Sequence, residues 1–406
     1  MLPGRLRLPV ALVAAVVVAE AAVLLLRPRG GVIDPIPVKA RSYFSQHELD
    51  RARSFRRPQL ALSLGQLAVE LGVLVLLVRR PPSRLRGRFR RPLLAGAAAG
   101  AALSAALTVA PLPLAAVARA RAVDAGLVTQ SWAGWLGDLA KSAAIGAALS
   151  GAGAALLLGL MRRFPRAWWA PGSMLAVGLG AVFLYAGPVV LDPVFNTFKP
   201  LPAGSLRSDV LALAGRARVK VGQVYEVDAS RRTTGANAYV TGLGHTKRVV
   251  LYDTLLRRFS ADETRLVVAH ELGHVHYDDV PRGLLYLALV APAALLAAGL
   301  LTDRIAPHDA TPGTPAVLPA AALSLALVGA GVGVVSNQLS RRVEARADTY
   351  SLRLTGLPAP FISSERRLAV QNLIEPDPPG WQTALLGTHP PTIARIGTAV
   401  AFERGR

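Results

Sequence analysis

The residues best suited to chemistry are two histidines and a glutamate in the segment His270-Glu271-Leu272-Gly273-His274. In an α-helix, residues four positions apart lie one turn above each other on one face, so His270 and His274 can hold a single ion. Glu271 can then reach a metal-bound water rather than the metal. Zinc lowers the pKa of that water, Glu271 accepts the proton, and the hydroxide attacks a carbonyl that zinc also polarises. The segment predicts one Zn²⁺ per chain and hydrolysis of peptide bonds.

The third protein ligand must come from elsewhere in the chain. An extended motif on the same helix would need glycine at position 277 and histidine at position 280, where the chain has Tyr277 and Val280. His276 is two residues past His274, so it points to another side of the helix. The chain has no cysteine, which excludes a thiolate ligand, a disulfide and a cysteine nucleophile.

Glu344 and Asp348 supply one solution, because they are four residues apart and share a helical face. Glu344 would bind zinc, and Asp348 would orient a ligand histidine through its ring N–H. The alternative is an ordinary charged helix in which arginines and carboxylates pair at the same spacing. Spacing alone leaves both interpretations open.

The local sequence predicts a helix for the two histidines. Ser260 and Glu263 have the spacing of a capping box, and a helix that starts there would run to about Tyr277. Three short strands are predicted upstream of it, at 224–228, 237–240 and 248–252. We therefore expect a small α+β catalytic segment of the zincin type.

Most of the remaining chain is apolar. Hydrophobic residues make up 52% of the 406 residues and charged residues only 17%, which is unusual for a water-soluble domain. Seven runs are long enough to cross a bilayer as helices, at about 8–26, 60–78, 93–118, 143–161, 173–195, 284–301 and 317–335. The predicted fold is mainly α, a transmembrane bundle or barrel of about seven helices with the small α+β segment attached.

Four units follow from this pattern. Residues 1–195 form a membrane region of about five spans with basic loops, and residues 196–282 form the catalytic segment. Residues 283–336 hold two further spans, and residues 337–406 form a C-terminal segment that supplies the third ligand. We expect a multi-pass protein of a bacterial plasma membrane.

The net charge of +21 is compatible with a nucleic-acid ligand or with an anionic membrane surface. Much of the arginine lies in short loops between apolar runs, with seven arginines in residues 79–91. A nucleic-acid protein would instead gather its charge on one face of a folded domain. We therefore expect the lipid bilayer and a peptide or membrane-protein substrate as partners, and no nucleic acid.

Four stretches carry a resemblance to a known family: residues 237–256, 267–279, 340–348 and 388–396. Weaker matches lie at 195–202 and at Asp138 with Lys141. Together they resemble the type I CAAX prenyl endopeptidases and their bacterial relatives, the HtpX-like integral-membrane zinc metalloproteases. The resemblance implies a helical barrel around a water-filled chamber, with zinc held by His270, His274 and Glu344 and with Glu271 as base.

The resemblance also assigns roles that spacing does not. It implies that Asn237, Ala238 and Tyr239 line the strand that binds substrate. It implies that His389 and Arg395 lie near the site and stabilise the developing oxyanion or the substrate backbone. From the residues alone, His389 would belong to a turn and Arg395 would be a surface charge. The stretch after the histidine motif differs from the family's usual sequence, and a bacterial chain is not expected to meet prenylated substrates.

Two questions stay open at this stage. The arginine-rich loop 79–91 would place the catalytic segment outside the cell by the positive-inside rule, whereas the resemblance implies the cytosolic side.

The leading function is hydrolysis of membrane-associated, lipidated or misfolded proteins. The alternatives are a non-proteolytic scaffold or chaperone that keeps a zinc site, and a transporter, for which Glu20 and Glu70 inside predicted spans would be polar groups. Glu271 disfavours the scaffold, because a structural zinc site needs no base.

Overall fold

The computed structural model describes residues 4–85, 89–242, 247–308 and 310–405. Residues 86–88 of the arginine-rich loop and 243–246 of one family-like stretch lie outside the described residues. Within the described part, seven helices are long and apolar enough to cross a membrane, which confirms the expected number. They are α1 (Gly4–Leu26), α2 (Gln46–Arg79), α3 (Pro92–Val109), α5 (Trp132–Arg163), α6 (Trp169–Val190), α11 (Asp279–Ile305) and α12 (Leu318–Thr355).

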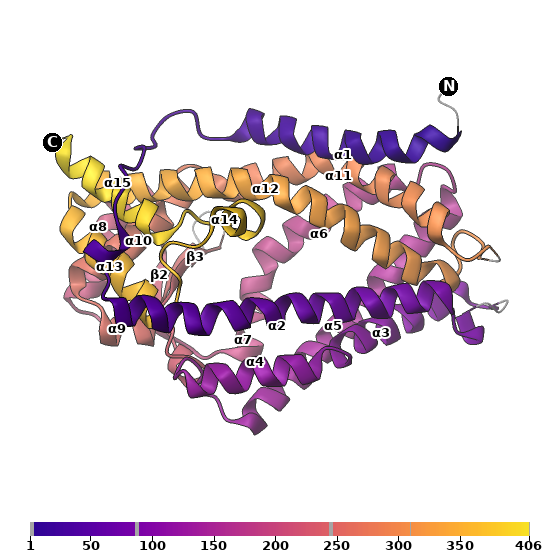
Figure 1. The fold of residues 1–406 in the computed structure, drawn as a ribbon, viewed down its shortest axis with the longest axis horizontal. Coiled ribbons are helices and arrows are strands. Elements are labelled where there is room, and N and C mark those ends of the chain that lie inside the picture. The colour runs from indigo at the N-terminus through magenta and orange to yellow at the C-terminus, as the bar shows by residue number, and fades with distance from the viewer. Residues whose placement is uncertain (1–3, 86–88, 243–246, 309, 406) are drawn as a thin grey trace.

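Most of the long helices run side by side along the longest axis of the molecule, and the strands with most of the shorter helices lie toward one end of them (Figure 1). The N-terminus lies at the opposite end from the C-terminus (Figure 1). The most apolar 18-residue window of α6 has no buried residue, and that of α2 is only 6% buried. Protein does not cover these apolar side chains, so lipid must, and the chain is an integral membrane protein.

The third predicted span is shorter than expected. The run 93–118 is divided into α3, which ends at Val109, and α4 (Leu112–Asp124). Pro111 lies between them, and a proline inside a helix removes a hydrogen bond and clashes with the preceding turn. α3 packs tightly on α5. A Cβ atom added to Gly100 of α3 would lie only 2.7 Å from the carbonyl oxygen of Ser150 of α5. Glycine at this position therefore lets the two backbones approach each other inside the membrane.

The end that carries the catalytic elements contains a four-stranded sheet. Its strands are β1 (Phe198–Pro200), β2 (Gln223–Val227), β3 (Ala238–Thr241) and β4 (Arg248–Tyr252), in the order β1-β2-β4-β3. β2 and β4 are parallel, and β1 and β3 are antiparallel to their neighbours. The three predicted strands are present, and β1 is an addition. In the described part of the chain β3 pairs with β4 alone, so it is an edge strand.

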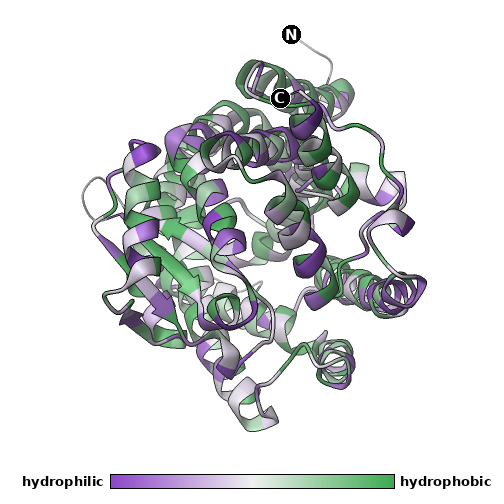
Figure 2. Ribbon diagram, turned by 90° about the vertical axis from the view of Figure 1, so that its left-hand side faces the viewer, coloured by the Kyte–Doolittle hydropathy of each residue, from purple (hydrophilic) through white to green (hydrophobic). Residues whose placement is uncertain are grey.

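Further short helices belong to this part of the chain and to the C-terminal segment. They are α7 (Asp192–Phe195), α8 (Ser205–Arg216), α9 (Asp253–Arg258), α10 (Ala261–His276), α13 (Pro358–Gln371), α14 (Gly380–Leu386) and α15 (Thr392–Arg404). Figure 2 faces this end and shows apolar residues along the strands. Val249 and Leu251 of β4 are fully buried in one cluster with Val268, Ala269 and Leu272 of α10. The sheet and the histidine helix therefore share a core.

Two membrane helices extend directly into the catalytic end. α11 begins at Asp279, only three residues after α10 ends, and α12 continues from Leu318 to Thr355 without a break. The predicted boundaries at 282/283 and 336/337 therefore lie inside single helices. Because α12 is one continuous helix, its membrane part fixes the position of the residues near its C-terminal end.

The capping box that begins α10 is formed as expected. The Ser260 N–H donates to Oε2 of Glu263 at 2.8 Å, and the Glu263 N–H donates to Oγ of Ser260 at 3.2 Å. We expect Ser260→Ala to lower the free energy of unfolding by about 1 kcal/mol, because it leaves helix N–H groups without an acceptor. Chemical unfolding of the detergent-solubilised protein would measure this change.

Ser205→Ala is the matched control, since Ser205 is an exposed residue at the start of α8, whose N-cap makes no side-chain hydrogen bond. Equal stabilities of the two variants would contradict a stabilising cap at Ser260.

Candidate metal centre

Two histidines of α10 and one glutamate of α12 meet at one point. Nε2 of His270 lies 3.2 Å from Nε2 of His274 and 3.2 Å from Oε2 of Glu344. Nε2 of His274 lies 3.7 Å from Oε1 of Glu344. One potential ligand atom from each residue lies within 4.8 Å of the other two, and the described residues hold no other group of three or more that could bind a metal. The three side chains are only 12–22% exposed.

This donor set fits a catalytic zinc ion. Two imidazoles and one carboxylate are a usual protein ligand set that leaves a coordination position open. Oε2 of Glu344 is buried and has no hydrogen-bond partner of good geometry, although nitrogens lie near it. Burial lowers the pKa of His270, but hydrogen bonds with Asp348 and Glu344 outweigh it and raise the pKa to about 10. The surroundings of this imidazole therefore favour positive charge, which a bound cation would supply.

Close packing of α12 on α10 brings Glu344 to the histidines. A Cβ on Gly273 would lie 3.1 Å from Cδ1 of Tyr350 and 3.4 Å from Cα of Ala347. A larger residue in the middle of the histidine motif would therefore push α12 away. His276 lies elsewhere, as expected: its ring stacks on Tyr350 with centroids 4.8 Å apart, and its Nδ1 lies 3.1 Å from the carbonyl oxygen of Ala217.

Asp348 lies behind the first histidine. Its Oδ1 is 2.9 Å from Nδ1 of His270, and the side chain is 1% exposed. Arg395 donates to both carboxylate oxygens of Asp348, at 2.8 and 2.5 Å, and its Nη1 lies 2.7 Å from Oε2 of Glu365. A carboxylate at Nδ1 leaves Nε2 free to face a metal. The geometry agrees with an orienting role for Asp348, which stays a prediction.

Arg395 is directed at carboxylates rather than at open space. Its side chain is 17% exposed, and although burial lowers its pKa, Asp348 and Glu365 raise it overall. Burial raises the pKa of Glu365 to about 7. A direct contact of Arg395 with substrate stays a prediction, and the contacts present favour action through Asp348. Sequence reasoning missed Glu365, because no motif or spacing connects α13 to the site.

Asp279 occupies the equivalent place behind the second histidine, and it was also missed. Its Oδ2 lies 3.0 Å from Nδ1 of His274, and Arg346 of α12 donates to its Oδ1. The Arg346 guanidinium also lies over the ring of Tyr277, 4.1 Å from its centroid. Asp278 has a left-handed backbone (φ 53°) that turns the chain between α10 and α11, which returns Asp279 to the histidine. Asp278 and Asp279 follow the histidine motif closely in the sequence, and this pair of carboxylates could have indicated a partner for His274.

Glu271 is the residue predicted to be the general base. Within the described residues it has no hydrogen bond or ion pair, and burial raises the pKa of its carboxyl. A carboxylate without a fixed partner can accept a proton from water, and a raised pKa makes it a stronger base near neutral pH.

His389 reaches the centre from the loop before α15. Its Nε2 lies 3.3 Å from Oε2 of Glu344, its Nδ1 lies 2.9 Å from Oγ1 of Thr388, and 57% of its side chain is exposed. His389 is therefore both next to the ligands and accessible to a substrate.

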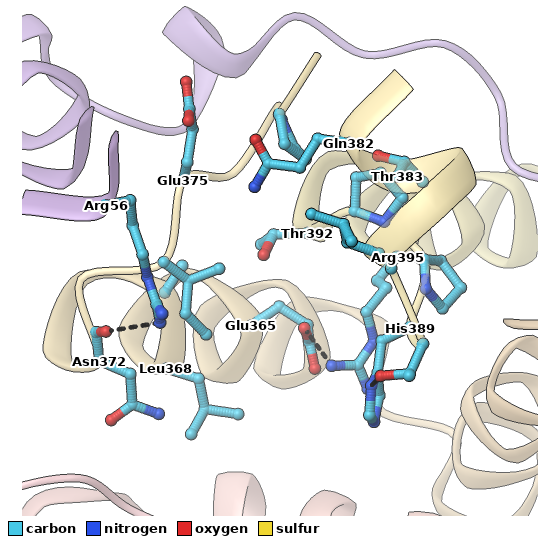
Figure 3. Close-up of a pocket in the computed structure, with 18 of the residues that line it drawn as sticks. Arg56, Glu365, Leu368, Asn372, Glu375, Gln382, Thr383, His389, Thr392 and Arg395 are labelled. Atoms are coloured by element: carbon cyan, nitrogen blue, oxygen red, sulfur yellow. Dashed lines mark hydrogen bonds and ion pairs between the residues drawn. The ribbon is translucent and has the colours of Figure 1, made fainter. Parts of the chain in front are cut away.

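The three residues expected to bind substrate lie at the start of the edge strand. Ala238 is 2% exposed and pairs with Leu251 of β4. The hydroxyl of Tyr239 donates to Oδ2 of Asp192 at 3.0 Å, and burial and Asp192 raise its pKa. Asn237 lines a cavity together with His389 and Arg395, and Figure 3 labels the last two. One edge of the strand has no partner strand among the described residues, although the Ala238 N–H donates to Oδ1 of Asn237 at 2.9 Å.

Comparison with known proteins identifies relatives of this chain. Residues 200–402 match the profile of Peptidase family M48. The chain is 32% identical to "Uncharacterized metalloprotease YhfN" of Bacillus subtilis over 312 residues, which cover 74% of this chain and 72% of that protein. It is 36% identical to CAAX prenyl protease 1 of Saccharomyces cerevisiae over 143 residues, or 34% of this chain and 31% of that protein.

A solved structure shares the whole fold. The crystal structure of S. mikatae Ste24p superposes with a TM-score of 0.76 at 20% sequence identity, and the match covers 98% of this chain and 99% of that one. The matched region therefore includes the seven membrane helices as well as the catalytic end.

The carboxylate behind each histidine should affect metal affinity. We expect Asp279→Asn to weaken zinc binding by about 10- to 100-fold, because the histidine loses the charged partner that fixes its ring. Competition with a chromogenic chelator would measure the zinc affinity.

Asp278→Asn is the matched control, since the neighbouring Asp278 is exposed and asparagine tolerates its left-handed backbone. If both variants bound zinc as tightly as the native chain, Asp279 would have no role at the metal.

Proposed function

Since this chain belongs to peptidase family M48 and is a membrane zinc metalloendopeptidase, we propose that His270, His274 and Glu344 hold one catalytic Zn²⁺ and that Glu271 is the general base. The observation that carries this assignment is the convergence of three ligand atoms within 4.8 Å of one another, from two helices that are distant in sequence. A zinc ion bound there would lower the pKa of a water molecule and polarise the peptide carbonyl.

The side chains around that point supply the proton transfers. Glu271 accepts a proton from the attacking water as the oxygen adds to the carbonyl carbon. It then delivers the proton to the amide nitrogen as the C–N bond breaks, so the base is regenerated at the end of the cycle. Its burial and lack of a competing partner support this role.

His389 is proposed to stabilise the negative charge that develops on the carbonyl oxygen. Its exposed imidazole lies beside Glu344, and a donor already in place costs no reorganisation during the reaction. Arg395 contributes by holding Asp348 against His270, so it is a positioning residue in this proposal.

The substrate is proposed to bind as an added strand on the unpaired edge of β3. An extended peptide would lie along Asn237, Ala238 and Tyr239 and pair with the backbone groups that face away from β4, and such pairing depends little on side-chain sequence. We propose peptide segments of membrane-associated, lipidated or misfolded proteins as the substrate class, in a bacterial plasma membrane. The S. cerevisiae relative is named for CAAX prenyl substrates, and the B. subtilis relative for proteolysis alone.

A set of variants separates the base from the ligands. We expect Glu271→Gln to keep one equivalent of zinc and to lower kcat by about 10²- to 10⁴-fold, because only the proton acceptor is lost. His270→Ala and Glu344→Ala should lose both zinc and cleavage. Metal analysis and cleavage of casein or a membrane peptide, both in detergent, would measure these effects.

His276→Ala is the control, since His276 is exposed and lies outside the ligand group. It should keep zinc and activity. Full activity of Glu271→Gln would show that another group is the base, and full zinc content of Glu344→Ala would remove the third ligand from the proposal.

Removal of the metal gives an independent test. Dialysis against a zinc chelator should abolish cleavage by the native protein, and about one equivalent of Zn²⁺ should restore it. Cleavage that persists in metal-free protein would argue against zinc-dependent hydrolysis.

A further inference from the structure

A cavity of about 520 Å³ with several charged side chains in its wall adjoins the candidate metal centre (Figure 3). It shares Asn237, His389 and Arg395 with the site already described. The other walls come from α2, α13, α14 and the loops around them, and include Arg56, Glu365, Leu368, Asn372, Glu375, Gln382 and Thr383. The cavity and the candidate metal centre therefore share part of their walls.

One charge in the cavity wall is not compensated. The two glutamates that line the cavity already have partners. Oε1 of Glu375 lies 3.3 Å from Nε of Arg53, and Glu365 pairs with Arg395, which also pairs with Asp348. Arg56 has no carboxylate within ion-pair distance among the described residues. A half-buried guanidinium without a counter-charge favours the binding of an anion.

Arg56 is held in place by the backbone. Its Nε donates to the carbonyl oxygen of Leu373 at 2.8 Å, and its Nη2 donates to that of Asn372 at 3.2 Å. These contacts use two of five N–H donors, so the remaining donors can bind an incoming group. A fixed guanidinium loses little side-chain entropy when it binds a carboxylate in a two-pronged geometry.

Asn372 adds a second unpaired group. Its Oδ1 is buried without a hydrogen-bond partner, and a Cβ on Gly235 would lie 3.2 Å from it. Gly235 directly precedes Ala236 and Asn237, which line the cavity and lead into the edge strand. That oxygen packs against Gly235 and is closed to a ligand, but the segment after Gly235 joins the cavity wall that holds Arg56 to the strand that is proposed to bind substrate.

We propose that this cavity is a subsite for a carboxylate of the peptide substrate and that Arg56 determines the preference for it. The carboxylate is either the free C-terminus of a short substrate or an acidic side chain close to the cleaved bond. This inference rests on the proposed proteolytic function, and it adds a preference that the metal centre alone does not provide.

The test uses the zinc-loaded, full-length protein in detergent and two pairs of fluorogenic peptides. One pair differs only in a free or an amidated C-terminus, and the other pair, with amidated ends, differs only in Glu or Gln near the C-terminus. The native enzyme should cleave the carboxylate member of one pair with a kcat/KM about tenfold or more above its partner, as expected for a charged hydrogen bond. The pair that shows the difference identifies the source of the carboxylate.

Arg56→Gln should bring that ratio close to one, and Arg56→Lys should keep part of it, because lysine retains the charge but not the planar fork. Arg57→Gln is the matched control: it removes the same charge from the next residue of α2, whose exposed side chain does not line the cavity. It should keep the native ratio, which separates a specific subsite from general attraction of acidic peptides to a chain of net charge +21.

Equal kcat/KM values within both pairs for the native enzyme would overturn the carboxylate subsite, and this comparison needs no variant to fold. Equal loss of the ratio in Arg57→Gln and Arg56→Gln would also overturn it. If zinc-loaded native protein cleaved none of the four peptides, the proposed function would fail and the subsite with it. Cleavage without a carboxylate preference would leave the function intact and remove the subsite alone.

Discussion

The packing of α12 against α10 is the constraint on which the metal centre depends. α10 carries both histidines, and α12 carries Glu344, which is proposed as the third ligand, together with Asp348 and Arg346. Glu344 and Asp348 are four residues apart and share the face that meets His270, whereas Arg346 lies two residues from each and reaches Asp279 from another side of the helix. The contact at Gly273 lets the two helices approach closely enough for these side chains to meet.

Each histidine has the same support built from different parts of the chain. His270 is backed by Asp348 and Arg395, and His274 is backed by Asp279 and Arg346. Buried ion pairs of this kind add little net stability compared with an apolar core, because both charges must lose their water. Their value here is geometric: they hold each imidazole with Nε2 directed at a common point.

The membrane helices also fix the position of the residues around the candidate metal centre. α11 and α12 cross the apolar region and continue into the catalytic end, so no flexible linker separates the two regions. α2 contributes Arg56 to the cavity beside the candidate metal centre, and its apolar window faces lipid. The wall of this cavity therefore includes a membrane helix as well as elements of the catalytic end.

The sequence alone determined the features that depend on local spacing and composition. The histidine motif, the cap at Ser260, the strands and the seven apolar runs follow from residues close together in the chain, where helical and strand periodicity and hydrophobicity act directly. Glu344 and Asp348 were found at helical spacing, but spacing could not distinguish metal ligation from an ordinary charged helix. The family resemblance was needed to favour ligation, and only the tertiary structure brought Glu344 to the histidines. The fold likewise decided the roles of Asp279, Glu365 and Arg56, because their partners lie on other elements and no periodic pattern records a contact between distant segments.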